Sequence, residues 1–207
     1  MLRFAPALPR CRRCALEVPE GAALRGACIT DPPPFDATLA ATTYGYRWDR
    51  LIAAFKFYSA LDLAPALARL LVRAHEAGAG SAPTLLLPVP LSRERQRERG
   101  YNQAWELAPR LGRTLHCPAD AGLLLRIKDT AHQLAFTPDR RAANVRSAFA
   151  LEPTRSAEVR GRHVTVVDDV MTTAATAAEI ARVLRAGGAA QVDVWVVART
   201  PRSDASR

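Results

Sequence analysis

The stretch VTVVDDVMTTAAT, residues 164–176, decides the fold that we predict for this chain. Its β-branched apolar beginning is typical of a buried strand, which leads directly into the adjacent carboxylates of Asp168 and Asp169. Threonine hydroxyls follow, and the Ala-rich amphipathic stretch at 177–189 then predicts a helix. A turn that joins a strand to a helix N-terminus collects free backbone N–H groups and the positive end of the helix dipole. These residues therefore predict an α/β fold with a phosphate site at this turn.

The two carboxylates suit groups that a phosphate does not offer, namely sugar hydroxyls or a Mg²⁺ ion. Either Asp168 or Asp169 could instead cap the following helix. A cap needs only one carboxylate, however, and both residues lie slightly too early in the sequence. Phosphoribosyl pyrophosphate combines a 5-phosphate, ribose hydroxyls and a metal-chelating pyrophosphate in one molecule. The pattern therefore favours this compound as the ligand.

Four further segments add to this pattern. They are CITDPPPFD (28–36), LIAAFKFYSALDLAPALARLL (51–71), PVPLSRERQRERGYNQAWELA (88–108) and RIKDTAHQLAFTPDRRAANVRSAF (126–149). Together with residues 164–176 they resemble, in order and in spacing, the ComF family of phosphoribosyltransferase-like proteins. The resemblance covers most of residues 10–199 and implies a type I phosphoribosyltransferase fold, an α/β fold in which helices flank a parallel sheet. Residues 37–207 would form that domain, and residues 1–36 a small, degenerate zinc-ribbon-like segment.

The resemblance also implies roles for the residues of the phosphate turn. Asp168 and Asp169 would hold the ribose hydroxyls, with Mg²⁺ as the companion of phosphoribosyl pyrophosphate. The hydroxyls and backbone amides of the turn would hold the 5-phosphate, and its residues are Thr172, Thr173, Ala174, Ala175 and Thr176. The family usually has Gly where this chain has Ala174. If the turn needs a positive φ there, Ala costs about 1 kcal/mol or more, and with a negative φ it costs nothing.

Arginines in the segment 93–99 follow the PVP turn at 88–90. They supply charge for a pyrophosphate leaving group, because guanidinium groups pair with phosphates through two hydrogen bonds. We assign this role to Arg93 and Arg99, and we expect the basic segment to be a loop. Asn102, at the start of the next helix, has two equal interpretations, a helix cap or a ligand contact.

The polar segment 128–146 has the length of a functional lid. By resemblance to the family, Lys128 and Arg140 would act in catalysis, where a cationic loop excludes water and neutralises the departing pyrophosphate. Other residues of the segment that match the family pattern are Thr130, Gln133, Arg141 and Asn144. Lys56, between two phenylalanines on a helix, is either a ligand contact or an amphipathic residue whose charge reaches solvent.

Cys11 and Cys14 form a C-x₂-C pair, and Cys28 follows. By resemblance, the family has a small zinc ribbon with two such pairs here. A structural zinc site takes four ligands, yet Arg25 stands where the second pair would begin. We therefore expect a degenerate ribbon that folds by packing and holds no zinc. Cys117 is expected to be an ordinary buried thiol.

The remaining pattern alternates strands with helices. The strands are expected at 37–46, 84–90, 122–127, 147–151, 163–168 and 192–198, and the helices at 48–58, 61–77, 102–115 and 175–187. This alternation implies a parallel sheet with its ligand at the carboxyl ends of the strands.

The charge of the chain is strongly positive, at +9, and almost all of it comes from arginine. A basic surface favours polyanions, so single-stranded DNA is a candidate partner. No apolar run approaches the roughly 20 residues of a membrane-spanning helix. The apolar part of the first residues is too short for a signal peptide. We therefore expect a cytoplasmic protein whose four cysteines form no disulfide.

Two functions from different classes remain open. The first is a ComF-type protein that binds phosphoribosyl pyrophosphate and, as the resemblance implies, serves DNA uptake in natural competence, with other competence proteins as partners. The second is an active phosphoribosyltransferase that transfers the 5-phosphoribosyl group to an unidentified nucleophile and releases pyrophosphate. The fold by itself does not choose between them, and the sequence does not determine an oligomeric state.

Overall fold

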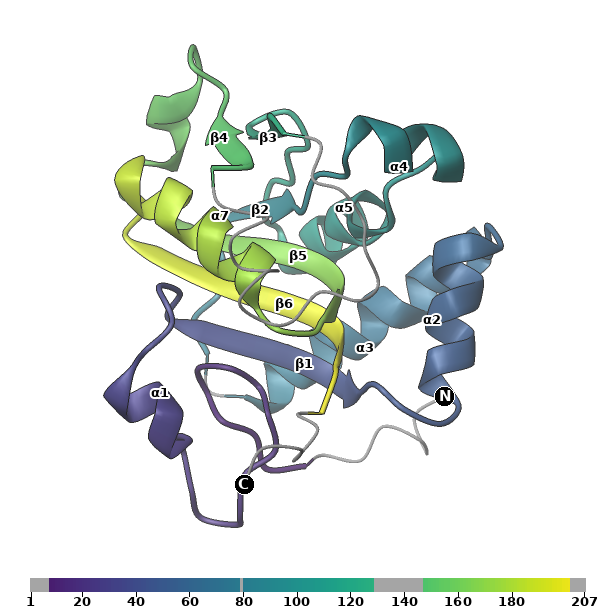
Figure 1. Ribbon diagram of the computed structural model, residues 1–207, viewed down its shortest axis with the longest axis vertical. Coiled ribbons are helices and arrows are strands. Elements are labelled where there is room, and N and C mark those ends of the chain that lie inside the picture. Colours follow the sequence, from purple (N-terminus) through teal and green to yellow (C-terminus); the bar gives the residue numbers. More distant parts are fainter. Residues whose placement is uncertain (1–7, 79, 129–146, 202–207) are drawn as a thin grey trace.

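A four-stranded parallel sheet forms the centre of the computed structural model, which describes residues 8–78, 80–128 and 147–201 (Figure 1). The strand order is β1-β6-β5-β2. The strands are β1 (Ala37–Thr43), β2 (Leu85–Pro88), β5 (His163–Met171) and β6 (Gln191–Arg199). All three pairings are parallel, and the pairing of β5 with β6 extends as far as Met171, which lies opposite Arg199. The predicted parallel α/β fold is therefore confirmed.

Helices cover both faces of this sheet. On one face lies α7 (Ala175–Ala186), and α3 (Ala64–Ala77) and α5 (Gln103–Leu115) lie behind the other (Figure 1). Side chains that alternate along β5 enter the two separate cores, with Val166 on the α7 side and Val167 on the side of α3 and α5. A strand that is covered on both faces buries side chains at successive positions, which explains Val164, Val166 and Val167.

Smaller elements complete the main domain. They are α2 (Trp48–Phe57), the 3-10 helices η2 (Leu61–Leu63) and η3 (Ser156–Val159), and the antiparallel strands β3 (Leu124–Arg126) and β4 (Phe149–Leu151). The positions of the predicted helices and strands agree with these bounds within a few residues. The predicted strands at 122–127 and 147–151, however, do not join the parallel sheet, because β3 and β4 pair with each other in a separate antiparallel sheet. None of the described helices combines the length and the apolar composition of a membrane-spanning segment.

The basic segment after β2 is a helix, α4 (Arg93–Arg99), so the prediction of a loop there is wrong. Ser92 caps its beginning, because its Oγ accepts a hydrogen bond from the N–H of Arg95 at 3.3 Å. Gly100, with a φ of 75°, ends it in the left-handed conformation that helix C-termini favour. The alternating charges hid the helix, because they leave no apolar stripe for a periodicity argument to detect.

The N-terminal segment, which includes α1 (Gly26–Thr30), is attached to the edge of the sheet at β1. The backbone N–H of Thr38 donates to the carbonyl of Arg12 at 2.8 Å, and the Thr38 hydroxyl donates to the carbonyl of Arg13 at 2.6 Å. The segment has an apolar cluster of its own, formed by Cys11, Cys14, Leu16 and Val18 with Cys28 against it. These contacts couple the small segment to the domain that carries the phosphate turn.

Candidate phosphate-binding site

A pocket lies at the carboxyl end of β5, where the chain passes from the strand into α7. Asp168, Val89 and every residue of the turn from Thr172 to Ala177 line it. The structure therefore brings the predicted turn residues and one of the two predicted carboxylates to one small space.

The acidic pair does not act as a pair on this pocket. β5 continues through both residues to Met171, because β6 provides backbone partners beyond them, with Asp168 opposite Val196. Side chains of a strand alternate between its faces, so Asp168 lines the pocket while Asp169 lies on the opposite face with only 4% of its surface exposed. The sequence predicts a strand that ends at Asp168 and, by resemblance, both carboxylates at the ribose hydroxyls, whereas the structure continues the strand and brings only Asp168 of the pair to the pocket.

The turn begins α7 with Ala174 in the left-handed conformation, at a φ of 66°. This is the conformation in which Ala costs stability, so of the two alternatives at this position the structure selects the strained one. The hydroxyl of Thr173 accepts a long hydrogen bond of 3.5 Å from the N–H of Ala175. Thr172 and Thr173 are exposed at the mouth of the turn, where an anion would meet their hydroxyls and the helix N-terminus.

The carboxyl group of Asp168 is partly enclosed, and its Oδ1 accepts a hydrogen bond from the N–H of Asp169 at 2.8 Å. Burial, followed by the negative charge of Asp169, raises the pKa of Asp168 to about 7. The nearby ammonium of Lys56 opposes this increase. A sugar hydroxyl that donated a hydrogen bond to Asp168 would favour the ionised form and lower its pKa.

Asp169 is held by Lys56, which reaches it from α2. The Lys56 Nζ lies 3.0 Å from Oδ1 and 2.9 Å from Oδ2 of this carboxylate. The ammonium group of Lys56 thus binds a buried carboxylate instead of extending into solvent, and its contact with a ligand stays a prediction.

Of the two arginines assigned to a pyrophosphate, Arg99 is close enough to Asp169 for their charges to interact. Its pKa is lowered by burial, and the charge of Asp169 acts in the opposite direction. Its guanidinium donates to Gln103 Oε1 at 3.1 Å and lies over the ring of Phe57. Arg93 is at the other end of α4, about 9 Å away along the helix axis, in a separate hollow between α4 and α5. Neither arginine lines the pocket at the phosphate turn, and the charge of Arg99 interacts with that of Asp169.

Asn102 is a helix cap. Its Oδ1 accepts from the N–H groups of Ala104 and Trp105 at the start of α5, at 2.9 and 3.4 Å. Its Nδ2 donates to the carbonyl of Val89, which lines the pocket. The residue therefore fixes the PVP turn and the start of α5 relative to each other.

The described part of the predicted lid is its beginning. Lys128 is exposed just after β3, and its carbonyl accepts a hydrogen bond from Arg126 Nε at 3.2 Å. Arg140 lies outside the described residues, as do Thr130, Gln133, Arg141 and Asn144. The catalytic roles that the family resemblance implies for Lys128 and Arg140 stay predictions.

Arg199 was not identified from the sequence. It is the last residue of β6, it is 5% exposed, and its guanidinium donates to the carbonyls of Cys14, Met171, Thr172 and Thr200. One buried side chain therefore ties the end of β5 and the phosphate turn to the N-terminal segment. A single charged residue at the end of the apolar run VWVVA was the available signal.

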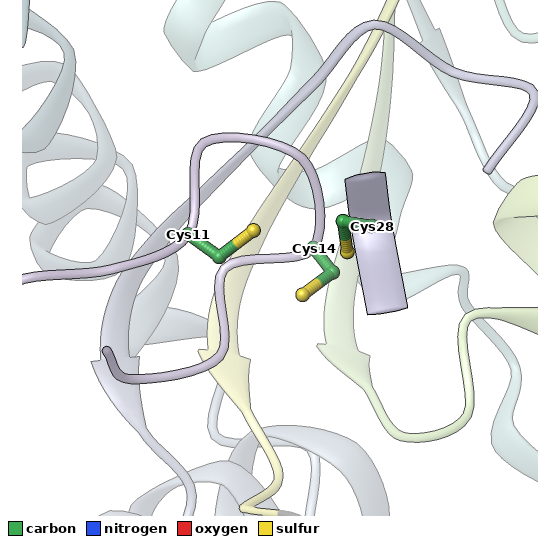
Figure 2. A group of neighbouring side chains, drawn as sticks. All are labelled: Cys11, Cys14 and Cys28. Carbon is green, nitrogen blue, oxygen red and sulfur yellow. The ribbon is translucent and has the colours of Figure 1, made fainter. Parts of the chain in front are cut away.

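A second cluster of chemically active side chains lies in the N-terminal segment (Figure 2). The Sγ atoms of Cys11, Cys14 and Cys28 all lie within 4.8 Å of one another, and among the described residues no His, Asp or Glu joins them. Burial alone would raise the pKa of Cys11, but N–H groups, that of Arg25 foremost, donate to its sulfur and bring the pKa below its usual value. Burial, then the neighbouring thiols, raise the pKa of Cys28 to about 12.

These thiols have the chemistry that zinc prefers but fall short of a closed site by one ligand. Arg25 stands at the fourth position and contributes a backbone N–H to Cys11 instead of a side chain. The described residues therefore do not fit a structural zinc ion with four protein ligands, and the absence of zinc stays a prediction. Cys117 is a free, buried thiol away from this cluster, as expected.

Comparisons with known proteins agree with this architecture. Residues 102–206 match the phosphoribosyl transferase domain family. The DNA utilization protein YhgH of Escherichia coli (strain K12) is 36% identical over 194 residues, which is 92% of this chain and 84% of that protein. Competence protein F of Haemophilus influenzae is 34% identical over 198 residues, 92% of this chain and 85% of that protein.

Among solved structures, the glutamine phosphoribosylpyrophosphate amidotransferase from B. subtilis, complexed with ADP and GMP, matches 70% of this chain and 30% of its own. Its TM-score is 0.47 and its sequence identity is 18%. The alignments with the Escherichia coli and Haemophilus influenzae relatives cover both the N-terminal segment and the main domain. This chain belongs to the ComF family, and its main domain is a phosphoribosyl transferase domain.

Proposed function

We propose that this protein binds phosphoribosyl pyrophosphate in the pocket between Asp168 and the turn before α7. The observation that carries the proposal is that one small pocket contains a carboxylate, threonine hydroxyls and the N-terminus of a twelve-residue helix. The helix N-terminus and the hydroxyls suit the 5-phosphate, and Asp168 suits the ribose hydroxyls.

The pyrophosphate end of the ligand would lie toward Arg99. This guanidinium is close enough to Asp169 for the two charges to interact, and paired N–H donors suit a pyrophosphate. Mg²⁺ would arrive with the ligand, because the pyrophosphate oxygens chelate it themselves.

The biological role that we propose is the handling of DNA. It rests on the relatives named DNA utilization protein and competence protein, and on the net charge of +9. Single-stranded DNA and other competence proteins would be the partners. We place the protein in the cytoplasm, where its four free cysteines would stay reduced.

Thermal unfolding with and without Mg²⁺ and phosphoribosyl pyrophosphate tests ligand binding. A ligand at 100 times its Kd adds about 2.7 kcal/mol to the free energy of unfolding, which corresponds to a Tm increase of about 5–10 °C for a domain of this size. Asp168→Asn combined with Asp169→Asn should remove that increase.

A matched variant, Asp120→Asn combined with Glu158→Gln, removes two carboxylates that pair with Arg155 and do not line the pocket. It should keep the full increase in Tm. An increase of equal size in both double variants would exclude the acidic pair from the site. The alternative function, an active transferase, is tested by incubating the protein and Mg²⁺ with labelled phosphoribosyl pyrophosphate and a set of candidate acceptor metabolites. Release of pyrophosphate would identify the protein as an active phosphoribosyltransferase.

A further inference from the structure

The ammonium group of Lys56 binds the carboxylate of Asp169, where a divalent cation would be expected to bind. Both oxygens of Asp169 lie within 3.0 Å of Nζ, and Oδ1 also accepts the N–H of Val170 at 2.8 Å. The side chain of Asp169 is only 5% exposed and that of Lys56 24%, so solvent screens the pair weakly. The charge of this carboxylate is therefore balanced by the protein itself.

The backbone that carries Lys56 is fixed on both sides. The Tyr101 hydroxyl donates to the carbonyl of Phe55 at 2.5 Å, and Gln103 Nε2 donates to the carbonyl of Lys56 at 3.1 Å. Gln103 is in turn oriented by Arg99, which donates to its Oε1. The junction between α4 and α5 thus holds the end of α2 in the position from which Lys56 reaches Asp169.

The carbonyls of Phe55 and Lys56 lie in the last turn of α2, where no intrahelical N–H group remains for them. The two hydrogen bonds therefore cap the end of this helix and at the same time fix the backbone that carries Lys56. A divalent cation bound to Asp169 would lie about 2.0–2.6 Å from a carboxylate oxygen, and therefore within roughly 5 Å of the ammonium. The repulsion at that distance is strong in a partly buried site.

We propose that Lys56 is the resident cation of the acidic pair, occupying at Asp169 the place of a divalent ion and presenting positive charge to the pyrophosphate end of the ligand. Asp169 is then a positioning residue for Lys56, and only Asp168 faces the ligand. The identity of the ligand rests on the proposed function, but the assignment of the cation does not.

Binding of Mn²⁺ to the free protein, followed by electron paramagnetic resonance, tests the assignment without any phosphoribosyl ligand. The wild-type protein and Lys56→Arg should show no Mn²⁺ site that depends on Asp169. Lys56→Met should gain at least tenfold in Mn²⁺ affinity, and adding Asp169→Asn to that variant should remove the gain. Lys56→Gln provides the same test with a polar side chain if the Met variant does not fold.

Two results would overturn the proposal. One is a wild-type Mn²⁺ site that Asp169→Asn abolishes, and the other is no gain in either folded neutral variant. A second measurement is the apparent affinity for phosphoribosyl pyrophosphate, obtained from the Tm increase at several ligand concentrations. This affinity should fall at least tenfold in Lys56→Met and persist in Lys56→Arg. An unchanged affinity in Lys56→Met would show that Lys56 does not contribute to ligand binding. If the wild type shows no increase at all, the proposed function fails while the Mn²⁺ measurement still decides the role of Lys56.

Discussion

At the scale of single residues, Ala174 stores strain in the phosphate turn, with a φ of 66°. Replacing it by Gly should raise the free energy of unfolding by about 0.5–1 kcal/mol, because the left-handed conformation costs an L-residue about 1–2 kcal/mol and the greater entropy of the unfolded Gly chain offsets part of that gain. Ala175→Gly is the matched control, since it lies in the helix at negative φ and should lower stability by up to about 1 kcal/mol. Urea denaturation measures both. Equal destabilisation by the two changes would show that the turn is unstrained.

Asp168 gives the stability of the free protein a pH dependence. Its pKa is about 7 in the folded state against an ordinary value of 3.8, so its contribution to stability is complete below pH 3.8 and is lost as the pH rises through 7. Asp168→Asn stays neutral, so between pH 5 and pH 8 it should gain stability relative to wild type by about 1 kcal/mol or more. Asp120→Asn is the control. Pairing with Arg155 lowers the pKa of Asp120, so the difference in stability between Asp120→Asn and wild type should stay constant from pH 5 to pH 8. Parallel stability curves for wild type and Asp168→Asn would contradict the shift.

At the scale of elements, the N-terminal segment lacks one zinc ligand. We expect the purified protein to contain much less than one zinc per chain, and a chelator to leave its Tm nearly unchanged, because the described residues offer three thiol ligands where a structural zinc ion takes four. Elemental analysis and thermal unfolding check this. Arg25→Cys would restore a C-x₂-C pair with Cys28, so this variant should bind one zinc and lose stability with a chelator. One tightly held zinc in the wild type would overturn the prediction and require a fourth ligand from outside the cluster.

At the scale of the whole molecule, the net charge of +9 predicts micromolar or weaker binding to single-stranded DNA, without sequence preference. Two of the N-terminal arginines are already engaged in hydrogen bonds within the protein. Arg10 donates to Thr43 and Arg13 to the carbonyl of Phe35, so both hold the segment together. Arg12→Gln with Arg25→Gln therefore tests this surface with less damage to the fold.

Fluorescence anisotropy at several salt concentrations measures the effect. If Arg12 and Arg25 each neutralise a phosphate, the slope of log affinity against log salt should become shallower by about 0.7 for each arginine that is replaced. Unchanged binding in this variant, together with weaker binding in Arg93→Gln with Arg97→Gln, would move the DNA-binding surface to the hollow between α4 and α5. No binding at low salt would contradict the proposed DNA-handling role.

The sequence by itself determined the parallel sheet, the strand and helix that flank the phosphate turn, and the family. These follow from local patterns: the apolar run before Asp168, the Ala-rich helix after the turn, and the order of the family segments. A strand buried on both faces and an amphipathic helix each have a periodicity that the sequence displays directly.

Only the tertiary structure decided what each charged residue contacts. Lys56 and Asp169 are separated by 113 positions in the chain, and Arg199 reaches Cys14 across 185. No local pattern encodes such contacts, because they arise when the sheet and its helices pack and bring distant side chains into one low-dielectric region. The conformation of Ala174 was also decided there, since its φ is set by the path from β5 into α7 and not by the preference of alanine.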